Sequence, residues 1–277
     1  MTIGARGPRT SISDLDGTYL DWVRSALDDE AAFSEFRQLP GIKSTVEGIK
    51  AADGEIYRNV ALRQTPHLWE HLDKFKTSDA VGSPDTAIYP EGRMSPTTWR
   101  YIKVLSDLQT LFGSLDGWRI AEIGVGYGGQ CKIIGDVHEI AGYVMFDLEP
   151  VSMLARRYLE QLASPLLERV ACPDFRRLGE GDLEVYDLVI SNWALSECAR
   201  EVQDRYIDCV LRRSTRGYIT YNQISSRFGV DSYLASDFID RLGFPVECRH
   251  EELSKPTNPE PWQSFVLHWG SEPRPID

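Results

Sequence analysis

A glycine-rich turn between residues 124 and 129 narrows the choice of fold more than any other segment of the chain. It follows an apolar segment at 119–123 that is typical of a short strand, and it precedes apolar residues at helical spacing. Glycines let the backbone approach a ligand closely, and the first turn of the following helix offers free N–H groups. We therefore expect a strand–turn–helix unit that binds a nucleotide-like ligand.

Strands and helices alternate after residue 118, which predicts a parallel α/β sheet. The last two predicted strands have no helix-length segment between them, so we expect an antiparallel strand at the end of the chain. The predicted strands are 119–123, 143–146, 187–190, 217–221, 246–251 and 265–269, and the helices between them begin near Gly129, Pro150, Glu201 and Ser232.

The first 94 residues lack this alternation. Pro40-Gly41 and Asp53-Gly54 are typical of breaks between helices, and the stretch 78–96 is rich enough in Ser, Pro, Gly and Asp to predict a loop. Apolar residues at helical spacing predict helices at 19–27, 30–36 and 45–51.

A further helix is expected to begin with Ser95 as its N-cap and Pro96 as its first residue. This start marks the boundary between two predicted domains. Residues 1–94 form a helical N-terminal cap that contributes to substrate binding. Residues 95–277 form a Rossmann-like domain that holds the ligand.

The composition excludes several kinds of partner. The chain has 42 acidic and 30 basic residues, a net charge of −12, which argues against nucleic acid and anionic membrane surfaces. Five scattered cysteines without a CxxC pair, the lack of an apolar leader and the lack of a long apolar run predict a cytoplasmic protein. We expect the partner to be a small molecule or a glycan. The sequence is also compatible with a homo-oligomer.

The glycine turn fits two ligand-binding patterns. Gly124, Gly126 and Gly129 match the GxGxxG fingerprint of nicotinamide dinucleotide enzymes. Gly124, Gly126 and Gly128, preceded by Glu122, match the turn of methyltransferases that bind S-adenosylmethionine (SAM).

Three features favour SAM. Glu122 is acidic where a dinucleotide fold prefers an apolar residue, and an acid there can help to hold the cationic methionyl end. The turn follows about 120 residues of chain instead of opening it, and an antiparallel last strand suits a methyltransferase. Asp147 follows the next predicted strand and suits the two hydroxyls of a ribose with either ligand.

Five segments of the chain carry a family resemblance: DAVGSP at 79–84, SPTTWRYIKV at 95–104, EIGVGYGGQCKII at 122–134, YDLVISNWALSEC at 186–198 and RGYITYN at 216–222. They are similar to a bacterial family of sugar O-methyltransferases, and the similarity extends over about residues 30–270. The resemblance implies a class I SAM-dependent fold and transfer of a methyl group to a hydroxyl. It also implies a sugar or glycosylated metabolite as acceptor, with S-adenosylhomocysteine (SAH) as the product of the donor.

The site residues follow from the turn, the resemblance and the rule that ligands bind at the carboxyl ends of parallel strands. Glu197 is the predicted general base, although it could instead cap the helix that begins near Ala199. Asp147 is the predicted ribose ligand, with Glu149 as an alternative. The residues expected to hold SAM are Glu122, Gly124, Gly126, Tyr127, Gly128, Gln130, Asp147 and Asn192; those expected to contact the acceptor are Arg100, Tyr101, Trp193, Tyr221 and Asn222.

Several alternatives stay open. The acceptor could be a polyketide, a peptide or a phenol in natural-product biosynthesis, and the protein could be an NAD(P)-dependent oxidoreductase or a non-catalytic SAM-binding protein. His67 and His71 have the i, i+4 spacing of a zinc pair, but no further Cys or His lies nearby. We therefore predict no metal site. The adenine contact is expected within 175–182, without a choice of residue.

Overall fold

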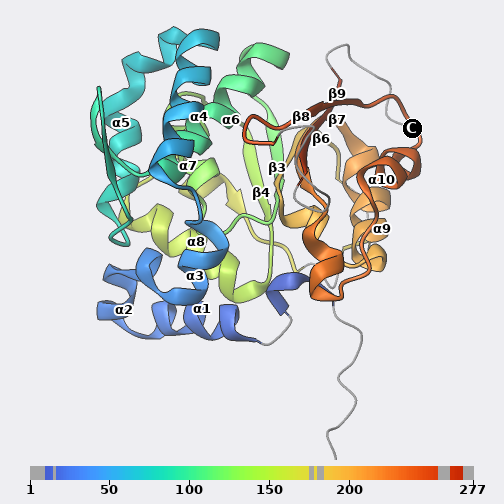
Figure 1. Ribbon diagram of the computed structural model, residues 1–277, viewed down its shortest axis with the longest axis horizontal. Helices are drawn as coiled ribbons and strands as arrows, with labels where there is room; N and C mark the ends of the chain where they lie inside the picture. Colours follow the sequence, from blue (N-terminus) through green and yellow to red (C-terminus); the bar gives the residue numbers. More distant parts are fainter. Residues whose placement is uncertain (1–9, 15–16, 175–177, 180–183, 255–262, 271–277) are drawn as a thin grey trace, which may run out of the picture.

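The computed structural model describes residues 10–14, 17–174, 178–179, 184–254 and 263–270. A seven-stranded sheet crosses this described part, with helices on both of its faces (Figure 1). The strand order is β5-β4-β3-β6-β7-β9-β8. These strands are β3 (Arg119–Ile123), β4 (Gly142–Phe146), β5 (Val170–Ala171), β6 (Tyr186–Asn192), β7 (Ser214–Asn222), β8 (Glu247–His250) and β9 (Ser264–Trp269).

The last strand, β9, lies between β7 and β8 and runs antiparallel to both. All neighbouring pairs from β5 to β7 are parallel. A dinucleotide-binding sheet has the order 3-2-1-4-5-6 and no such inserted strand. The sheet is therefore Rossmann-like, and the predicted fold class, a mostly parallel α/β sheet with an antiparallel last strand, is confirmed.

Alternation along the central strand β3 sends its side chains into two cores, because successive side chains of a strand point to opposite faces. Ile120 joins one core, and Ala121 and Ile123 join the other. Helices cover both cores, as a parallel sheet requires. The first core lies under α6 (Pro96–Phe112), α7 (Gly129–Gly135) and α8 (Glu149–Gln161), and the second under α9 (Arg200–Cys209) and α10 (Ala235–Leu242).

The N-terminal helices pack onto the first of these faces. Helix α1 lies against α8, and α4 lies against α6, on the left of the view in Figure 1. Their apolar residues, Val23 and Tyr57 among them, belong to the same core as Ile120. These helices are α1 (Thr18–Asp28), α2 (Glu30–Ser34), α3 (Pro40–Val46), α4 (Ala51–Gln64) and α5 (Leu72–Thr77).

Two N-terminal predictions are wrong. No helix spans 45–51, since α3 begins at Pro40 and α4 at Ala51. Asp53-Gly54 lies inside α4, where the Asp53 carboxylate accepts a hydrogen bond from the Lys50 N–H (3.3 Å). Gly54 is there for packing, because a Cβ would lie 2.3 Å from the Tyr89 hydroxyl.

The predicted loop at 78–96 also contains regular structure. A short hairpin joins β1 (Ala87–Tyr89) to β2 (Gly92–Met94). Ser95 caps α6 as expected, because its hydroxyl accepts a hydrogen bond from the Thr97 N–H (3.2 Å) and Pro96 is the first helical residue.

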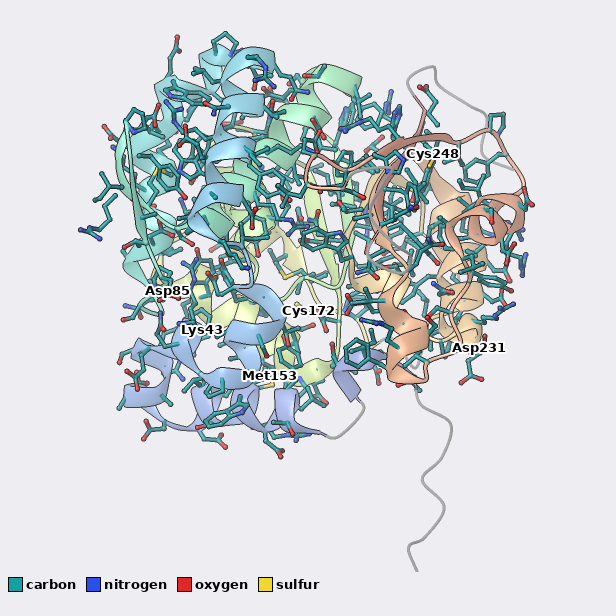
Figure 2. All side chains as sticks on the ribbon, viewed as in Figure 1. Lys43, Asp85, Met153, Cys172, Asp231 and Cys248 are labelled. Carbon is teal, nitrogen blue, oxygen red and sulfur yellow. The ribbon has the colours of Figure 1, made fainter. Side chains whose placement is uncertain are left out.

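All five cysteines are free thiols, and Cys172 and Cys248 lie in different parts of the molecule (Figure 2). Within the described ranges, none of the helices has both the length and the apolar character needed to cross a bilayer.

Candidate active site

A cavity of about 890 Å³ lies at the carboxyl ends of β3, β4, β6 and β7. Its volume is within the range of sites that enclose a small organic ligand, about 300–1,000 Å³. The glycine turn, Asp147 and the segment after β6 form one wall, and the N-terminal part of the chain forms the other. The predicted site residues that line it are Arg100, Tyr101, Glu122, Gly124, Gly126, Asp147, Asn192, Trp193, Glu197 and Asn222.

The glycine turn needs its glycines for the shape of the backbone. Gly124, Gly126 and Gly128 have φ angles of 77°, 52° and 85°, a region in which residues with a Cβ are strained. Gly124 is also in close contact with the segment after β6, because a Cβ there would lie 1.9 Å from the Cβ of Ala194. The turn is thereby held against the 3-10 helix Ala194–Glu197 that carries the predicted base.

Asp147 binds the backbone of the glycine turn. Its Oδ2 accepts hydrogen bonds from the N–H groups of Val125 (2.8 Å) and Gly126 (3.3 Å), and its Oδ1 accepts one from Leu148 (2.7 Å). Burial raises the pKa of Asp147 to about 6 although these hydrogen bonds act to lower it. Glu149, the alternative ribose ligand, is the first residue of α8 and does not line the cavity.

Glu122 is buried in the cavity wall and accepts a hydrogen bond from the Tyr143 hydroxyl (2.6 Å). Burial raises the pKa of Glu122 to about 8, against the lowering effect of that hydrogen bond. The nearby side-chain amide of Asn192 also acts to lower the pKa of Glu122. The two groups do not form a hydrogen bond of regular geometry. Glu122 is therefore mostly protonated at pH 7.

Glu197 faces the cavity and accepts a hydrogen bond from the Asn222 side-chain amide (2.9 Å). Burial raises the pKa of Glu197 above its ordinary value. The alternative in which Glu197 caps α9 is wrong, because the N-cap is Ala199 and no side chain caps that helix.

Trp193 joins β6 to the segment that carries Glu197. Its φ of 68° is a left-handed conformation that costs a non-glycine residue about 1–3 kcal/mol. The indole N–H donates to the Ser264 hydroxyl (2.8 Å), and the guanidinium carbon of Arg100 lies 3.9 Å from the ring centroid. These contacts hold the strained residue in place at the edge of the cavity.

Four residues that we expected to contact SAM or the acceptor do not line the cavity. Their assignment as direct ligand contacts is corrected accordingly. Tyr127 is buried in the core against Tyr158, and Gln130 donates to the Tyr101 carbonyl oxygen (3.3 Å). Gly128 faces α8, where a Cβ would lie 3.3 Å from that of Ala155. Tyr221 packs on Phe238 in the core under α10, since it precedes Asn222 on the strand and points to the opposite face.

The N-terminal part of the chain, which we expected to contribute to substrate binding, supplies a wall whose individual residues the sequence did not identify. The Ala199 N–H donates to the Thr10 carbonyl oxygen (2.8 Å), and Ser11 forms a β-bridge with Cys198. Most of this wall carries hydroxyl groups, which form no pattern in the sequence. The hydroxyl-bearing residues of this wall are Thr10, Ser11, Ser13, Tyr19, Ser44 and Thr45, and Val46, Gly48 and Ile49 complete it. Of the segment 175–182, expected to contact adenine, all but 178–179 lies outside the described residues.

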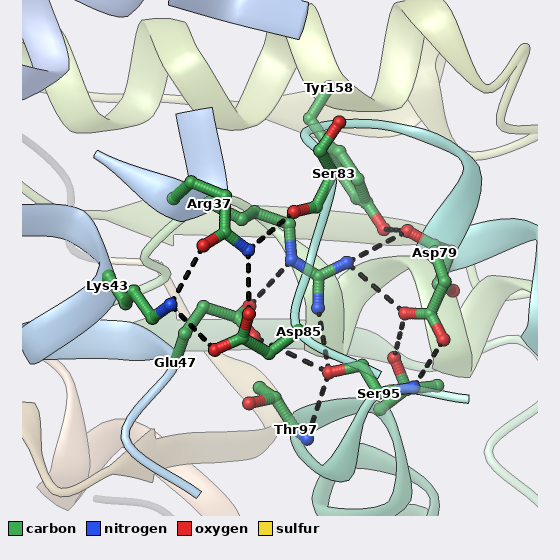
Figure 3. A network of polar contacts seen from close by, with 12 residues as sticks. Arg37, Lys43, Glu47, Asp79, Ser83, Asp85, Ser95, Thr97 and Tyr158 are labelled. Carbon is green, nitrogen blue, oxygen red and sulfur yellow. Dashed lines mark hydrogen bonds and ion pairs between the residues drawn. The ribbon is translucent and has the colours of Figure 1, made fainter. Parts of the chain in front are cut away.

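A buried charge network joins the N-terminal helices to the start of α6 (Figure 3). Arg37 donates to Glu47 (2.6 Å), Asp79 (3.2 Å) and the Ser95 hydroxyl (3.2 Å). Arg37 is fully buried, and Glu47 nearly so. The network lies directly behind the cavity wall, because Val46 lines the cavity beside Gly126.

In the part of the chain that the structure describes, no three His, Cys, Asp or Glu residues are arranged to hold a metal ion. His67 shares a hydrogen bond with the Gln109 side chain (2.8 Å), and His71 packs against Phe75.

No protein-family model and no curated protein sequence matches the chain. Similar solved structures include magnesium protoporphyrin IX methyltransferase from Synechocystis PCC 6803 with bound SAM, at 16% identity over 78% of this chain and 95% of that one, with a TM-score of 0.47. Another is a SAM-dependent methyltransferase from Clostridium acetobutylicum ATCC 824, at 8% identity over 60% and 88% of the two chains (TM-score 0.47). A third is precorrin-6y C5,15-methyltransferase from Geobacter metallireducens GS-15, at 14% identity over 60% and 86% (TM-score 0.43).

Proposed function

We propose that this protein is a SAM-dependent O-methyltransferase that methylates a hydroxyl of a sugar or a glycosylated metabolite. The observation that carries the proposal is the acidic lining of the cavity at the glycine turn. Four carboxyl groups line it, those of Glu122, Asp147, Asp174 and Glu197, and Arg100 is the single Lys or Arg among the described lining residues.

This lining suits a cationic donor. Burial favours the neutral forms of Glu122 and Asp147, and a cation bound nearby would favour their ionised forms. A nicotinamide dinucleotide would instead bring two phosphate charges to the same turn, next to these acids. The inserted strand β9 also separates this sheet from a dinucleotide-binding sheet.

Three residues fit the parts of SAM. Asp147 lies at the end of β4, where its carboxylate can accept hydrogen bonds from the ribose hydroxyls. The carboxylate of Glu122 and the side-chain oxygen of Asn192 can accept hydrogen bonds from the methionyl ammonium group. When bound, SAM supplies an electrophilic methyl group on a sulfonium.

Glu197 would hold the proton lost by the acceptor hydroxyl. Asn222 donates to Oε1 of Glu197, which leaves the other carboxylate oxygen able to accept a hydrogen bond from the acceptor. General bases of this kind contribute about 10²–10⁴-fold to a rate. The raised pKa of Glu197 makes its carboxylate a stronger base than an exposed one.

The hydroxyl-rich wall supports a polar acceptor such as a sugar. The hydroxyls of Ser44 and Thr45 each donate to the Gly41 carbonyl oxygen, so their lone pairs are available to accept hydrogen bonds from a ligand. A phenol, polyketide or peptide would make less use of these groups. We keep these as alternative acceptors of the same reaction.

Isothermal titration of the full chain with SAH, SAM, NAD and NADP tests the donor. We expect binding of SAH and SAM and no binding of either dinucleotide. Binding of a dinucleotide without SAH would contradict the proposal. Incubation with SAM and a panel of glycosides, phenols and polyketides, followed by mass spectrometry for methylated product, then tests the acceptor class. Donor binding with no methylated product would instead favour a non-catalytic SAM-binding protein.

A further inference from the structure

Arg100 is a buried cation without an anionic partner. Its side chain comes from α6 and lines the cavity, and the residue is only 6% exposed. It makes no hydrogen bond or ion pair with any residue that the structure describes, and its Nη2 is buried without a partner. A guanidinium in this position has lost most of its hydration and gained no hydrogen bond in return.

The other buried cations of the described chain show that this is unusual. Each of them forms an ion pair with at least one carboxylate, as burial of a charge requires. The pairs are Arg37 with Glu47 and Asp79, Arg58 with Glu91, Lys103 with Asp107 and Glu252, and Lys132 with Asp136. Arg100 alone among these five points into a cavity large enough for a ligand.

The guanidinium is held flat, with its N–H groups available. It lies over the ring of Trp193 at 3.9 Å and near the ring of Tyr101 at 6.0 Å. Stacking on an aromatic face leaves the N–H groups at the edge of the guanidinium plane free, and that edge matches the two oxygens of a carboxylate. A ligand that brings a carboxylate to this edge would therefore supply the missing partner.

The neighbours of Arg100 identify which carboxylate this is. Its charge acts on the carboxyl of Glu122, yet the two groups form no ion pair. The next residue along α6, Tyr101, packs against the glycine turn. A Cβ added to Gly129 would lie only 2.3 Å from the Tyr101 ring, so this part of α6 is in close contact with the turn. Glu122 and Arg100 therefore line one pocket without forming an ion pair. Such a pair of groups complements a ligand with an ammonium and a carboxylate on the same carbon, the acid facing the ammonium and the guanidinium facing the carboxylate.

We infer that Arg100 binds the α-carboxylate of the methionyl group of the donor, while Glu122 faces the α-ammonium. The inference rests on the proposed function and deepens it, since it assigns the residue that selects a donor with an intact amino-acid group. Arg100 is stacked on Trp193, so the same contact links donor binding to the segment that carries Glu197.

The experiment is isothermal titration of the full chain with SAH and with decarboxylated SAH, which keeps the adenosyl group and the amine but lacks the carboxylate. We expect the wild-type protein to bind SAH about 10- to 100-fold more tightly than the decarboxylated compound, the range for hydrogen bonds to a charged group. Arg100→Met should lose this preference, because the substitution should weaken the binding of SAH and leave the binding of the decarboxylated compound unchanged. Arg100→Lys should keep part of it, because it keeps the charge without the planar fork.

Equal affinity of the wild-type protein for the two compounds would overturn the inference, and this arm needs no variant that has to fold. Unchanged SAH affinity in Arg100→Met, with an unchanged melting temperature, would also overturn it. If that variant raised only the KM of a carboxylated acceptor, Arg100 would bind the acceptor instead, which overturns the assignment to the donor. Failure of the wild-type protein to bind SAH at all would overturn the proposed function itself.

Discussion

The guanidinium of Arg37 lies 4.8 Å from the ring centroid of Tyr127, which belongs to the glycine turn. Arg37 comes from the N-terminal part of the chain, and it forms ion pairs with Glu47 and Asp79. The turn that lines the ligand cavity is therefore supported from behind by a buried ion network. Arg37 therefore contacts both the N-terminal ion network and the glycine turn.

Arg37→Met is expected to lower the free energy of unfolding by about 3–5 kcal/mol, because it leaves the buried carboxylate of Glu47 and the largely buried one of Asp79 without their cation. Urea denaturation followed by circular dichroism measures this. The matched control is Lys43→Met, which removes the exposed ion pair with Asp85 (2.7 Å) and should cost less than about 1 kcal/mol. Equal losses in the two variants would show that the Arg37 network is not a major source of stability.

Gly124→Ala is expected to abolish SAH binding and to destabilise the protein. The new methyl group would require both a strained φ and a displacement of Ala194. Gly117→Ala is the control, since Gly117 has a similar φ of 75° but a Cβ added there would have no other atom within 4 Å. Titration with SAH should show loss of binding in the first variant and near-wild-type binding in the second. If both variants bound SAH normally, the close contact at Gly124 would have no role in the site.

Glu197→Gln is expected to reduce kcat at least about 100-fold while leaving SAH affinity unchanged, because the amide cannot accept the hydroxyl proton. Steady-state kinetics and titration measure the two effects separately. Glu201→Gln changes an exposed acid in the first turn of α9 and should leave kcat unchanged. A kcat for Glu197→Gln close to that of the wild-type protein would remove Glu197 from the role of base.

SAH binding is expected to strengthen as the pH rises from 6 to 8. Burial raises the pKa of Glu122 to about 8, so the group is protonated through most of this window and must lose its proton to face the ammonium. The gain is at most about tenfold per pH unit. Asp147, with a pKa of about 6, contributes mainly at the lower end of the window.

Titrations in buffers of different ionisation enthalpy should show proton release on SAH binding at pH 7. Glu122→Gln has no proton to release there and should lose most of the pH dependence. A wild-type affinity that is flat from pH 6 to 8 would contradict this coupling.

The sequence predicted every strand of the sheet except the two-residue edge strand β5 (Val170–Ala171), and it predicted the side of the cavity built on those strands. Glu122, Asn192 and Asn222 lie at the carboxyl ends of apolar strands and Asp147 directly after one, and parallel strands place these ends at one edge of the sheet. Tyr221 was assigned wrongly because a shift of one residue along a strand reverses the face.

The opposite wall was not predictable in the same way. Most of its residues carry hydroxyl groups and lie near 10–19 and 44–45, where they have no periodicity and reach the cavity only through tertiary packing. The Arg37 network was missed for the same reason, since it joins residues 37, 47, 79 and 95 through contacts far apart in the chain. Neither arrangement has a local signal in the sequence.

The pairing of Ser11 with Cys198 has a consequence for the order of folding. The two residues are separated by most of the sheet, so the bridge cannot form during synthesis until β3, β4 and β6 have all emerged. Contacts at such long sequence separation form slowly, because the chain must first close a large loop. This wall of the cavity is thus expected to close only after the segment that follows β6 has been synthesised.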